Sequence, residues 1–197
     1  MEIRRTANAG VLLTLDDVKI LLDGVCREVL SYPATPPVIK QELISCPPDI
    51  VLFTHDHEDH FDPEYYQKVN RRCMASQKVR ITSVPTRHMG HYGKNTEHQS
   101  FVIEGSQTIW FLGDASPMEL KKLADFPKPD VLMIPYPYIS TPAALKMVEA
   151  LLPCKIVLLH MPLPAHDPEQ IWQTVQDGMD HLKAYLYVPE LGETFNI

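Results

Sequence analysis

The feature that most constrains this chain is a cluster of metal-ligand side chains at positions 55–60, with the sequence HDHEDH. The cluster directly follows the apolar run 50–53, IVLF, which has the length and β-branched content of a buried strand. So many imidazoles and carboxylates beside a buried strand would be costly unless a cation compensates them. A rigid strand that ends in such a loop is the arrangement expected of an active site.

The spacing inside the cluster indicates metal binding. His55 and His57 are two residues apart, which directs both side chains to the same side of an extended segment. Two imidazoles do not complete a site, so further ligands must come from other strand ends. His88, Asp114 and His160 each follow a segment that is predicted to be a strand. Since zinc and similar ions prefer imidazole and carboxylate, these residues are candidate ligands.

Some of these residues have alternative interpretations. A lone buried histidine is usually a hydrogen-bonded core residue, so a ligand role for His88 depends on the cluster. His91 lies three residues after His88 and is the alternative third ligand of the first site. We expect Asp56 and Glu58 to face solvent or to contact the ligands from behind. His98 begins a predicted strand and is interpreted as structural.

Four residues of the cluster form the pattern H-x-H-x-D-H, namely His55, His57, Asp59 and His60. This pattern resembles the signature of the metallo-β-lactamase superfamily, and the later candidate ligands resemble its remaining motifs. The resemblance covers nearly the whole chain. It implies an α/β fold, specifically a four-layer αββα sandwich in which metals bind at one edge between two packed sheets. The order of predicted elements alone would also allow a simpler α/β sheet.

The resemblance also implies a role for each candidate ligand. Three imidazoles would form the first metal position, those of His55, His57 and His88. One carboxylate and two imidazoles would form the second position, those of Asp59, His60 and His160. Asp114 would bridge the positions, and Asp59 would also orient the attacking water and handle its proton. The implied cofactors are two divalent metal ions, zinc in the first instance, with manganese or iron compatible with the same ligands.

The implied function is metal-dependent hydrolysis of a small ester, lactone or phosphate-bearing metabolite. The short chain, its opening strands and the segment 111–114, FLGD, look most like the small hydrolases related to ascorbate-6-phosphate lactonase, although the extra segments of that lactonase are missing. Two alternatives stay open. One is a phosphodiesterase or nuclease of the same superfamily, and the other is a non-hydrolytic di-iron protein that carries out redox chemistry or binds oxygen.

Length and composition limit the possible domain organisation, partners and location of the protein. A chain of 197 residues suits one domain, which we place at 1–197. The formal net charge of −7 argues against a broad nucleic-acid-binding face, so a small molecule is the expected partner. No apolar run approaches the roughly 20 residues of a membrane span, and the amino terminus lacks the apolar stretch of a secretion signal. We therefore expect a cytoplasmic protein, and the sequence does not indicate its oligomeric state.

Periodicity and turn residues predict the secondary structure. Strands are expected at 2–7, 11–15, 18–22, 50–53, 79–84, 99–104, 107–112, 131–134, 155–159 and 185–188. Helices are expected at 38–45, 63–72, 117–124, 142–152 and 167–182. Asp62 is the expected N-cap of the second helix, and the proline-rich segment 24–37 is expected to form a flap. The four cysteines form no C-x-x-C pair and are expected to be free thiols.

Overall fold

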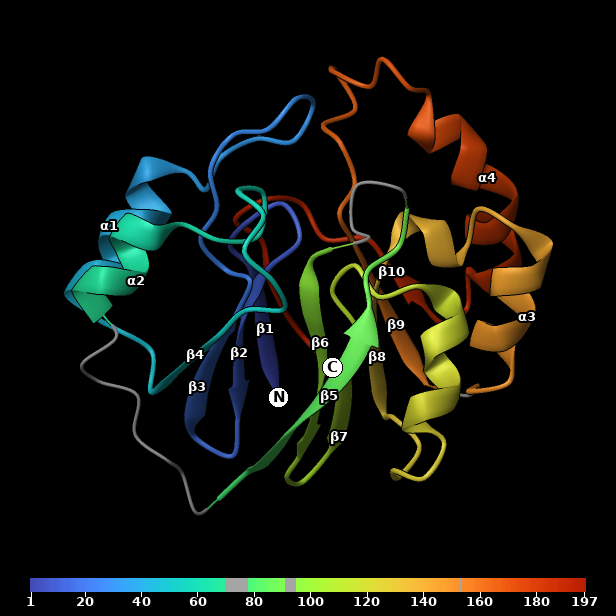
Figure 1. Cartoon of the computed structure of the whole chain (residues 1–197), viewed down its shortest axis with the longest axis horizontal. Coiled ribbons are helices and arrows are strands. Elements are labelled where there is room, and N and C mark those ends of the chain that lie inside the picture. Colours follow the sequence, from blue (N-terminus) through green and yellow to red (C-terminus); the bar gives the residue numbers. More distant parts are fainter. Residues whose placement is uncertain (70–77, 91–94, 153) are drawn as a thin grey trace.

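Two β-sheets pack face to face, and helices cover the outer face of each sheet (Figure 1). The computed structural model describes residues 1–69, 78–90, 95–152 and 154–197. The four-layer αββα sandwich that the sequence resemblance implies is confirmed. The simpler single-sheet arrangement is therefore wrong.

The first sheet contains β1 (Glu2–Arg5), β2 (Val11–Leu15), β3 (Val18–Leu22), β4 (Ile50–Leu52) and β11 (Thr194–Asn196). Their order is β11-β1-β2-β3-β4, in which β3 and β4 are parallel and the other neighbours are antiparallel. A parallel pair needs a crossover connection, and here the crossover includes helix α1 (Pro37–Ser45). Helix α2 (Pro63–Val69) lies beside α1 on the outer face of this sheet (Figure 1).

The second sheet contains β5 (Arg80–Arg87), β6 (Glu97–Glu104), β7 (Thr108–Phe111), β8 (Val131–Pro135), β9 (Lys155–Leu159) and β10 (Leu186–Tyr187). The order β10-β9-β8-β7-β6-β5 is parallel from β10 to β7 and antiparallel from β7 to β5. Its outer face is covered by the 3-10 helices η2 (Pro117–Leu123) and η3 (Tyr136–Tyr138) and by the α-helices α3 (Pro142–Glu149) and α4 (Ile171–Leu182).

Side-chain alternation along the central strands separates two hydrophobic layers. In β6, Phe101 and Ile103 face the space between the sheets, whereas Val102 faces the helices. In β8, Met133 faces the other sheet and Leu132 faces the helices. All of these side chains are at most 2 % exposed, and each buried one contributes roughly 1.5–3 kcal/mol. The second sheet is therefore fixed from both sides and forms a rigid support for the loops at its edge.

Strand direction brings the candidate ligands to one edge of the sandwich. β3 and β4 run parallel, so Asp23 and the cluster 55–60 leave the first sheet at the same end. In the second sheet β5 runs in the same direction as β7, β8 and β9, because β6 is antiparallel to both β5 and β7. His88, Asp114 and His160 follow the carboxyl ends of these strands, where α/β proteins commonly bind ligands.

Some element boundaries differ from the prediction. β1 ends at Arg5, two residues early, because the next two backbone N–H groups both donate to the Gly10 carbonyl in a turn. α4 begins at Ile171 rather than at Asp167, because the Asp167 carboxylate accepts the Ile171 N–H at 2.9 Å and caps the helix from outside. Segment 117–123 is a 3-10 helix instead of an α-helix, and the short strand β11 was not predicted.

The predicted start of α2 is confirmed. The Asp62 carboxylate accepts the backbone N–H groups of Glu64 and Tyr65 at 2.9 and 3.2 Å, and Pro63 occupies the first helical position. The predicted end of this helix at position 72 lies outside the described residues. Among the described cysteines, Cys26, Cys46 and Cys154 are free thiols, as expected.

None of the helices in the described part of the chain combines the length and apolarity needed to span a bilayer.

Candidate metal centre

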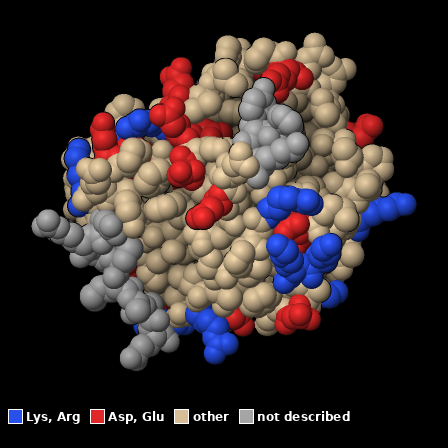
Figure 2. All heavy atoms as spheres, in the orientation of Figure 1, with Lys and Arg blue, Asp and Glu red and all other residues tan. Residues whose placement is uncertain are grey.

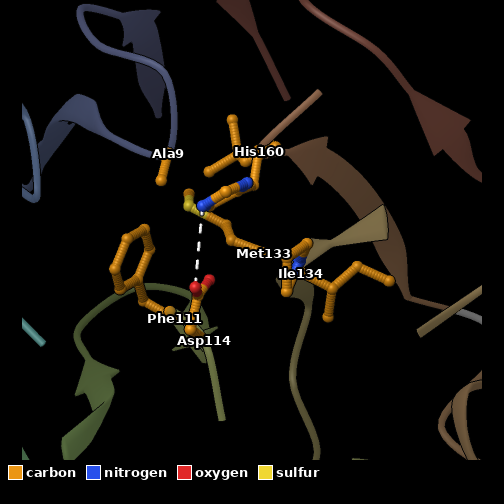
Figure 3. Close-up of a pocket in the computed structure, with 9 residues that line it drawn as sticks. Ala9, Phe111, Asp114, Met133, Ile134 and His160 are labelled. Atoms are coloured by element: carbon orange, nitrogen blue, oxygen red, sulfur yellow. Dashed lines mark ion pairs between the residues drawn. The ribbon is translucent and has the colours of Figure 1, made fainter. Parts of the chain in front are cut away.

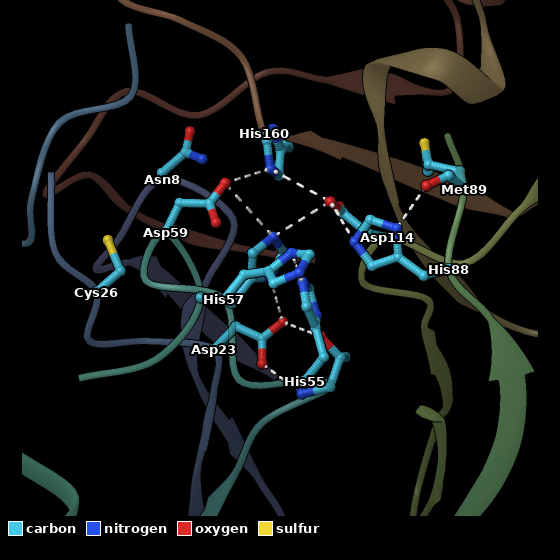
Figure 4. Close-up of polar contacts among 12 residues, drawn as sticks. Asn8, Asp23, Cys26, His55, His57, Asp59, His88, Met89, Asp114 and His160 are labelled. Carbon is cyan, nitrogen blue, oxygen red and sulfur yellow. Dashed lines mark hydrogen bonds and ion pairs between the residues drawn. The ribbon is translucent and has the colours of Figure 1, made fainter. Parts of the chain in front are cut away.

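Histidine and aspartate side chains from separate strand ends meet at the edge between the sheets (Figure 4). The structure brings together all seven candidate ligands predicted from the sequence: His55, His57, Asp59, His60, His88, Asp114 and His160. The alternative third ligand, His91, lies outside the described residues.

The candidate ligands form three groups in which the ligand atoms lie within 4.8 Å of one another. The first group is His55, His57 and His88, and the second is Asp59, His60 and His160. A third group, formed by His55, His60 and Asp114, overlaps both. The first two groups have the same members as the two metal positions that the sequence resemblance implies.

One oxygen of Asp114 lies between the first and second groups. Its Oδ2 is 3.6 Å from His88 Nε2 in the first group. The same atom is 3.5 Å from His60 Nε2 and 3.6 Å from His160 Nε2 in the second group. Asp114 therefore faces both groups with a single carboxylate oxygen.

Gly113 allows Asp114 to reach this position. Its φ is +52°, in the left-handed region that L side chains rarely adopt, and a Cβ at this residue would lie 2.4 Å from Thr54 Cγ2. Only glycine tolerates both this φ and so close an approach between the end of β7 and the loop after β4. The tight contact fixes Asp114 opposite the histidine cluster.

Contacts behind the rings fix how three histidines face the centre. His88 Nδ1 donates to the next backbone carbonyl, and His60 Nδ1 contacts Asp23 Oδ2 at 2.8 Å. Asp23 also accepts the Thr54 hydroxyl at 2.7 Å, which leaves the Thr54 oxygen to accept from His55 Nδ1 at 2.9 Å. Each ring thus holds Nδ1 against a fixed acceptor and turns Nε2 toward the centre, the arrangement usual for a metal-ligating histidine.

Burial and mutual charge set the protonation of the centre. Burial lowers the pKa of His55, so that ring is neutral. Burial alone would lower the pKa of His60 as well, but the carboxylates of Asp114 and Asp23 raise it well above its usual value. Burial would raise the pKa of Asp114, but the charges of His160 and His60 hold it well below its usual range. The Asp114 carboxylate is therefore ionised, and a bound cation would replace the His60 proton.

The donors present fit divalent metal ions. The Nε2 atoms of His60 and His88 are buried, and within the described part of the chain neither has a hydrogen-bond partner. An unsatisfied buried polar group costs about 1–3 kcal/mol, so a cation that binds His88 Nε2, and His60 Nε2 in place of its proton, would remove this penalty. Mixed imidazole and carboxylate donors are compatible with zinc, manganese and iron.

Apolar side chains close the space behind Asp114 and His160. Figure 3 shows Asp114 and His160 facing each other across a small pocket, whose lining also includes Ala9, Phe111 and Met133. Apolar side chains of this kind lower the local dielectric behind the centre. Electrostatic attraction within the centre is correspondingly stronger than it would be in water.

The flap at 24–37 approaches the second group. The edge of the Tyr32 ring contacts His160, with ring centroids 4.4 Å apart and an interplanar angle of 74°. The flap is tied to the histidine loop by the Arg27 N–H, which donates to the Glu58 carbonyl at 2.7 Å. Burial raises the pKa of Tyr32 and of Tyr136, so both phenols are neutral hydrogen-bond donors near the centre.

Two further polar residues contact the candidate ligands, one just before β6 and one within it. Thr96 Oγ1 lies 3.1 Å from His57 Nε2, and the His98 ring lies 5.1 Å from the His55 ring. His98 was interpreted as structural, and its 6 % exposure and its hydrogen bond with Thr86 fit that interpretation, although its ring also lies beside that of a candidate ligand. Burial lowers its pKa to about 3. The uninterrupted polar run TEHQS, at the start of a predicted strand, was the signal that could have placed it there.

Comparison with solved structures identifies similar folds at low sequence identity. A possible metal-dependent hydrolase from Veillonella parvula has a TM-score of 0.73 and 16% identity, with 100% of this chain and 99% of that chain covered. An isothiocyanate hydrolase from Delia radicum gut bacteria has a TM-score of 0.70 and 16% identity, with 100% and 99% covered. CmlA, a diiron beta-hydroxylase from Streptomyces venezuelae, has a TM-score of 0.70 and 15% identity, with 100% and 54% covered.

Sequence comparison gives a more direct assignment than these similarities of fold. No curated protein matches the chain. A family model described as a beta-lactamase superfamily domain matches residues 2–161, which is most of the sequence and includes every candidate ligand. This chain therefore belongs to the beta-lactamase superfamily.

Proposed function

We propose that this protein is a metal-dependent hydrolase that holds two divalent metal ions at the centre. The observation that carries the proposal is the position of Asp114 Oδ2 between two groups of ligand atoms. The first position would be formed by His55, His57 and His88, and the second by Asp59, His60 and His160. When bound at such a site, metal ions polarise a substrate oxygen and lower the pKa of a water molecule.

The two aspartates have different surroundings, which supports different roles. Asp114 is held between His60, His88 and His160 and would bridge the two positions. Asp59 contacts His160 Nε2 at 3.2 Å and keeps 14% of its side chain exposed. It can therefore orient an attacking water on the open side of the centre and accept its proton.

The proposed substrate is a small ester, lactone or phosphate-bearing metabolite, as in the hydrolases related to ascorbate-6-phosphate lactonase. The neutral phenols of Tyr32 and Tyr136 hydrogen-bond to each other, which leaves one hydroxyl of the pair to donate to an oxygen atom of such a molecule. One of the similar structures is described as an isothiocyanate hydrolase, which also supports a small-molecule substrate.

A phosphodiesterase or nuclease is less well supported. A nucleic-acid-binding surface needs clustered cations to neutralise phosphates. On the face drawn in Figure 2, lysine and arginine side chains lie in small groups beside acidic ones. Lys122 and Arg87, for example, flank Glu119 with nitrogen to oxygen distances of 2.7 and 3.8 Å. These cations are already paired with a carboxylate.

A di-iron protein is the second candidate, favoured by the similarity of fold to a diiron beta-hydroxylase. The same imidazole and carboxylate donors accept iron as well as zinc. A coloured protein with about two iron atoms and no hydrolysis would favour this candidate. A colourless zinc protein that hydrolyses esters would exclude it.

The deciding experiment combines metal analysis with a substrate screen. The purified protein is analysed for zinc, manganese and iron, and its turnover is measured on p-nitrophenyl acetate, a simple lactone and bis-p-nitrophenyl phosphate. We expect about two metal ions per protein chain and turnover of an ester or lactone. This turnover should be lost when a chelator removes the metal and should return when metal is added back. Hydrolysis of the phosphodiester alone would favour the nuclease alternative. Turnover that survives complete metal removal would refute the proposal.

A further inference from the structure

The histidines of the centre are not all held in the same way. Nδ1 of His55 lies against a hydroxyl, Nδ1 of His60 against a carboxylate, and Nδ1 of His88 against a backbone carbonyl. His160 also turns Nε2 toward the centre, 3.2 Å from Asp59, but its Nδ1 is buried without a hydrogen-bond partner among the described residues. The orientation of His160 must therefore come from contacts other than a hydrogen bond to the ring.

The backbone of His160 is in an unusual conformation. Its φ is +57°, a left-handed value that costs an ordinary residue roughly 1–2 kcal/mol. Such a conformation persists when the surrounding structure holds it in place. The His160 N–H donates to the Asn8 carbonyl at 3.2 Å, which attaches the end of β9 to the turn after β1.

Arg5 fixes both sides of this attachment. One guanidinium nitrogen, NH2, donates to the Asn8 carbonyl at 3.1 Å and to the Met161 carbonyl at 3.4 Å. The first carbonyl is the acceptor of the His160 N–H, and the second belongs to the residue that follows His160. The other donors of Arg5 reach the carbonyls of Ala7 at 3.2 Å and Pro189 at 2.9 Å.

The surroundings of Arg5 are unusual for a cation. The side chain is only 6% exposed, and the four groups to which it donates are neutral backbone carbonyls rather than carboxylates. Burial of a charge without a counter-ion is expensive unless several hydrogen bonds compensate it. The neighbouring Arg4 behaves in the ordinary way and pairs with Glu42 at 2.7 Å on the exposed face of β1.

We propose that Arg5 is a positioning residue for the candidate ligand His160, acting through the Asn8 and Met161 carbonyls. The proposal rests on the proposed metal-binding function, because His160 belongs to the second metal position. Arg5 holds the strained backbone of His160, and Tyr32 packs against the ring, so Nε2 faces Asp59 and Asp114 although Nδ1 has no hydrogen-bond partner among the residues that the structure describes. These contacts of Arg5 and Tyr32 support His160 and therefore the second metal position. Among the described residues, none of them involves a candidate ligand of the first position.

A general structural role for Arg5 would have a different consequence. If the guanidinium merely joined the first turn to the C-terminal segment through Pro189, its loss would lower stability and affect both metal positions alike. A positioning role predicts unequal effects. Loss of an outer contact to a metal ligand typically weakens metal binding by about 10–100-fold, and here one of two equivalents should be affected.

The test is a zinc titration of Arg5→Met, Arg5→Lys and the matched control Arg4→Met. Two stepwise zinc dissociation constants are measured by competition with a chelator, and the folding of each metal-free variant is checked by circular dichroism. In Arg5→Met we expect one of the two zinc dissociation constants to rise by about 10–100-fold. The other should stay within about twofold of the wild-type value. Arg5→Lys should recover part of this loss because an ammonium can still donate to the carbonyls, and Arg4→Met should match the wild type.

The outcomes separate this proposal from the proposed function. Wild-type protein that binds fewer than two zinc ions would contradict the dinuclear centre itself. If a folded Arg5→Met variant binds both zinc ions with wild-type affinity, or binds both more weakly to the same extent, the positioning role of Arg5 is wrong. The dinuclear centre itself would not be contradicted. If Arg5→Met does not fold, the same comparison is made on Arg5→Lys, and wild-type zinc binding by that variant would overturn the role.

Discussion

The carboxylate of Asp23 lies behind His60 and accepts from its Nδ1 at 2.8 Å. The same carboxylate accepts the hydroxyl and the backbone N–H of Thr54, each at 2.7 Å. Because Thr54 Oγ1 is in turn 2.9 Å from His55 Nδ1, one buried side chain at the end of β3 orients a candidate ligand of each metal position. Asp23 is 1% exposed, so water does not compete for these contacts.

We expect Asp23→Asn to weaken both metal equivalents, by about 10–100-fold, because it disturbs the support of both His55 and His60. Asparagine is the suitable replacement, since it tolerates the φ of +45° at this residue better than most side chains. Metal binding is measured by chelator competition. Asp49→Asn is the control, because Asp49 contacts Lys19 away from the centre. Unchanged affinity at both positions in Asp23→Asn would show that the contacts behind the rings are not needed.

The candidate ligands could be identified from the sequence because each stands at a strand end in a characteristic pattern. The spacing of His55 and His57 is local, the strands before Asp114 and His160 are apolar and long enough to recognise, and β-branched residues mark the strand before His88. What the sequence could not show is which strand ends meet. That depends on the order and direction of strands in two sheets, which the family resemblance implied and the structure shows.

The residues behind the ligands were missed for a different reason. Asp23 follows the strand ILL much as Asp114 follows the strand FL and a glycine, but a single carboxylate after a strand is common in proteins. Its role depends on the parallel register of β3 and β4, which places it beside Thr54. The structural interpretation of His98 fits its burial and its contact with Thr86, but the sequence could not show that β6, which begins at Glu97, places this ring beside that of His55.

Gly113→Ala should destabilise the protein and displace Asp114. The left-handed φ alone costs roughly 1–2 kcal/mol, and overlap with Thr54 adds a further penalty of about 1–3 kcal/mol. Gly90→Ala is the matched control, because Gly90 also has a positive φ, +72°, but its added Cβ would have no neighbour within 4 Å. The free energy of unfolding is measured in urea. Equal losses in the two variants would show that contact with Thr54 is unimportant.

Asp62 provides a pH-dependent contribution to stability. Burial would raise the pKa of Asp62, but hydrogen bonds from Lys40 and the Tyr65 N–H outweigh it and lower the pKa. A folded-state pKa below the unfolded value of about 3.9 means that the contribution is present above that pH and is lost as pH falls through the folded value. We expect Asp62→Ala to cost about 1 kcal/mol at pH 7 through loss of the cap, and less under acid. The free energy of unfolding of both proteins is measured in urea from pH 7 to pH 3. A difference between the two proteins that stays constant over this pH range would contradict the prediction.

The hydrogen bonds around His98 predict its tautomer. The Ser100 hydroxyl donates to the Leu112 carbonyl at 3.0 Å, so its oxygen accepts from Thr86 at 3.1 Å. The Thr86 oxygen is then free to accept from His98 Nδ1 at 2.8 Å. His98 should therefore carry its proton on Nδ1, which long-range proton–nitrogen NMR detects directly. Thr86→Val should disturb this tautomer and Thr86→Ser should retain it; a proton on Nε2 in the wild type would contradict the chain of donors.

The two proposed metal positions can be separated by removing one ligand from each. His57 belongs to the first group and Asp59 to the second, so His57→Ala and Asp59→Ala should each fold and each lose one metal equivalent. Asp59→Ala should also lower turnover by about 10²–10⁴-fold even where metal is restored in excess, because the group that accepts the proton of the attacking water is gone. Asp56→Ala is the control, since Asp56 is an exposed carboxylate of the same loop. Metal content and turnover are measured together. Full activity in either ligand variant would refute its assignment, whereas loss of both metals at once would indicate that the positions are filled cooperatively through the shared carboxylate of Asp114.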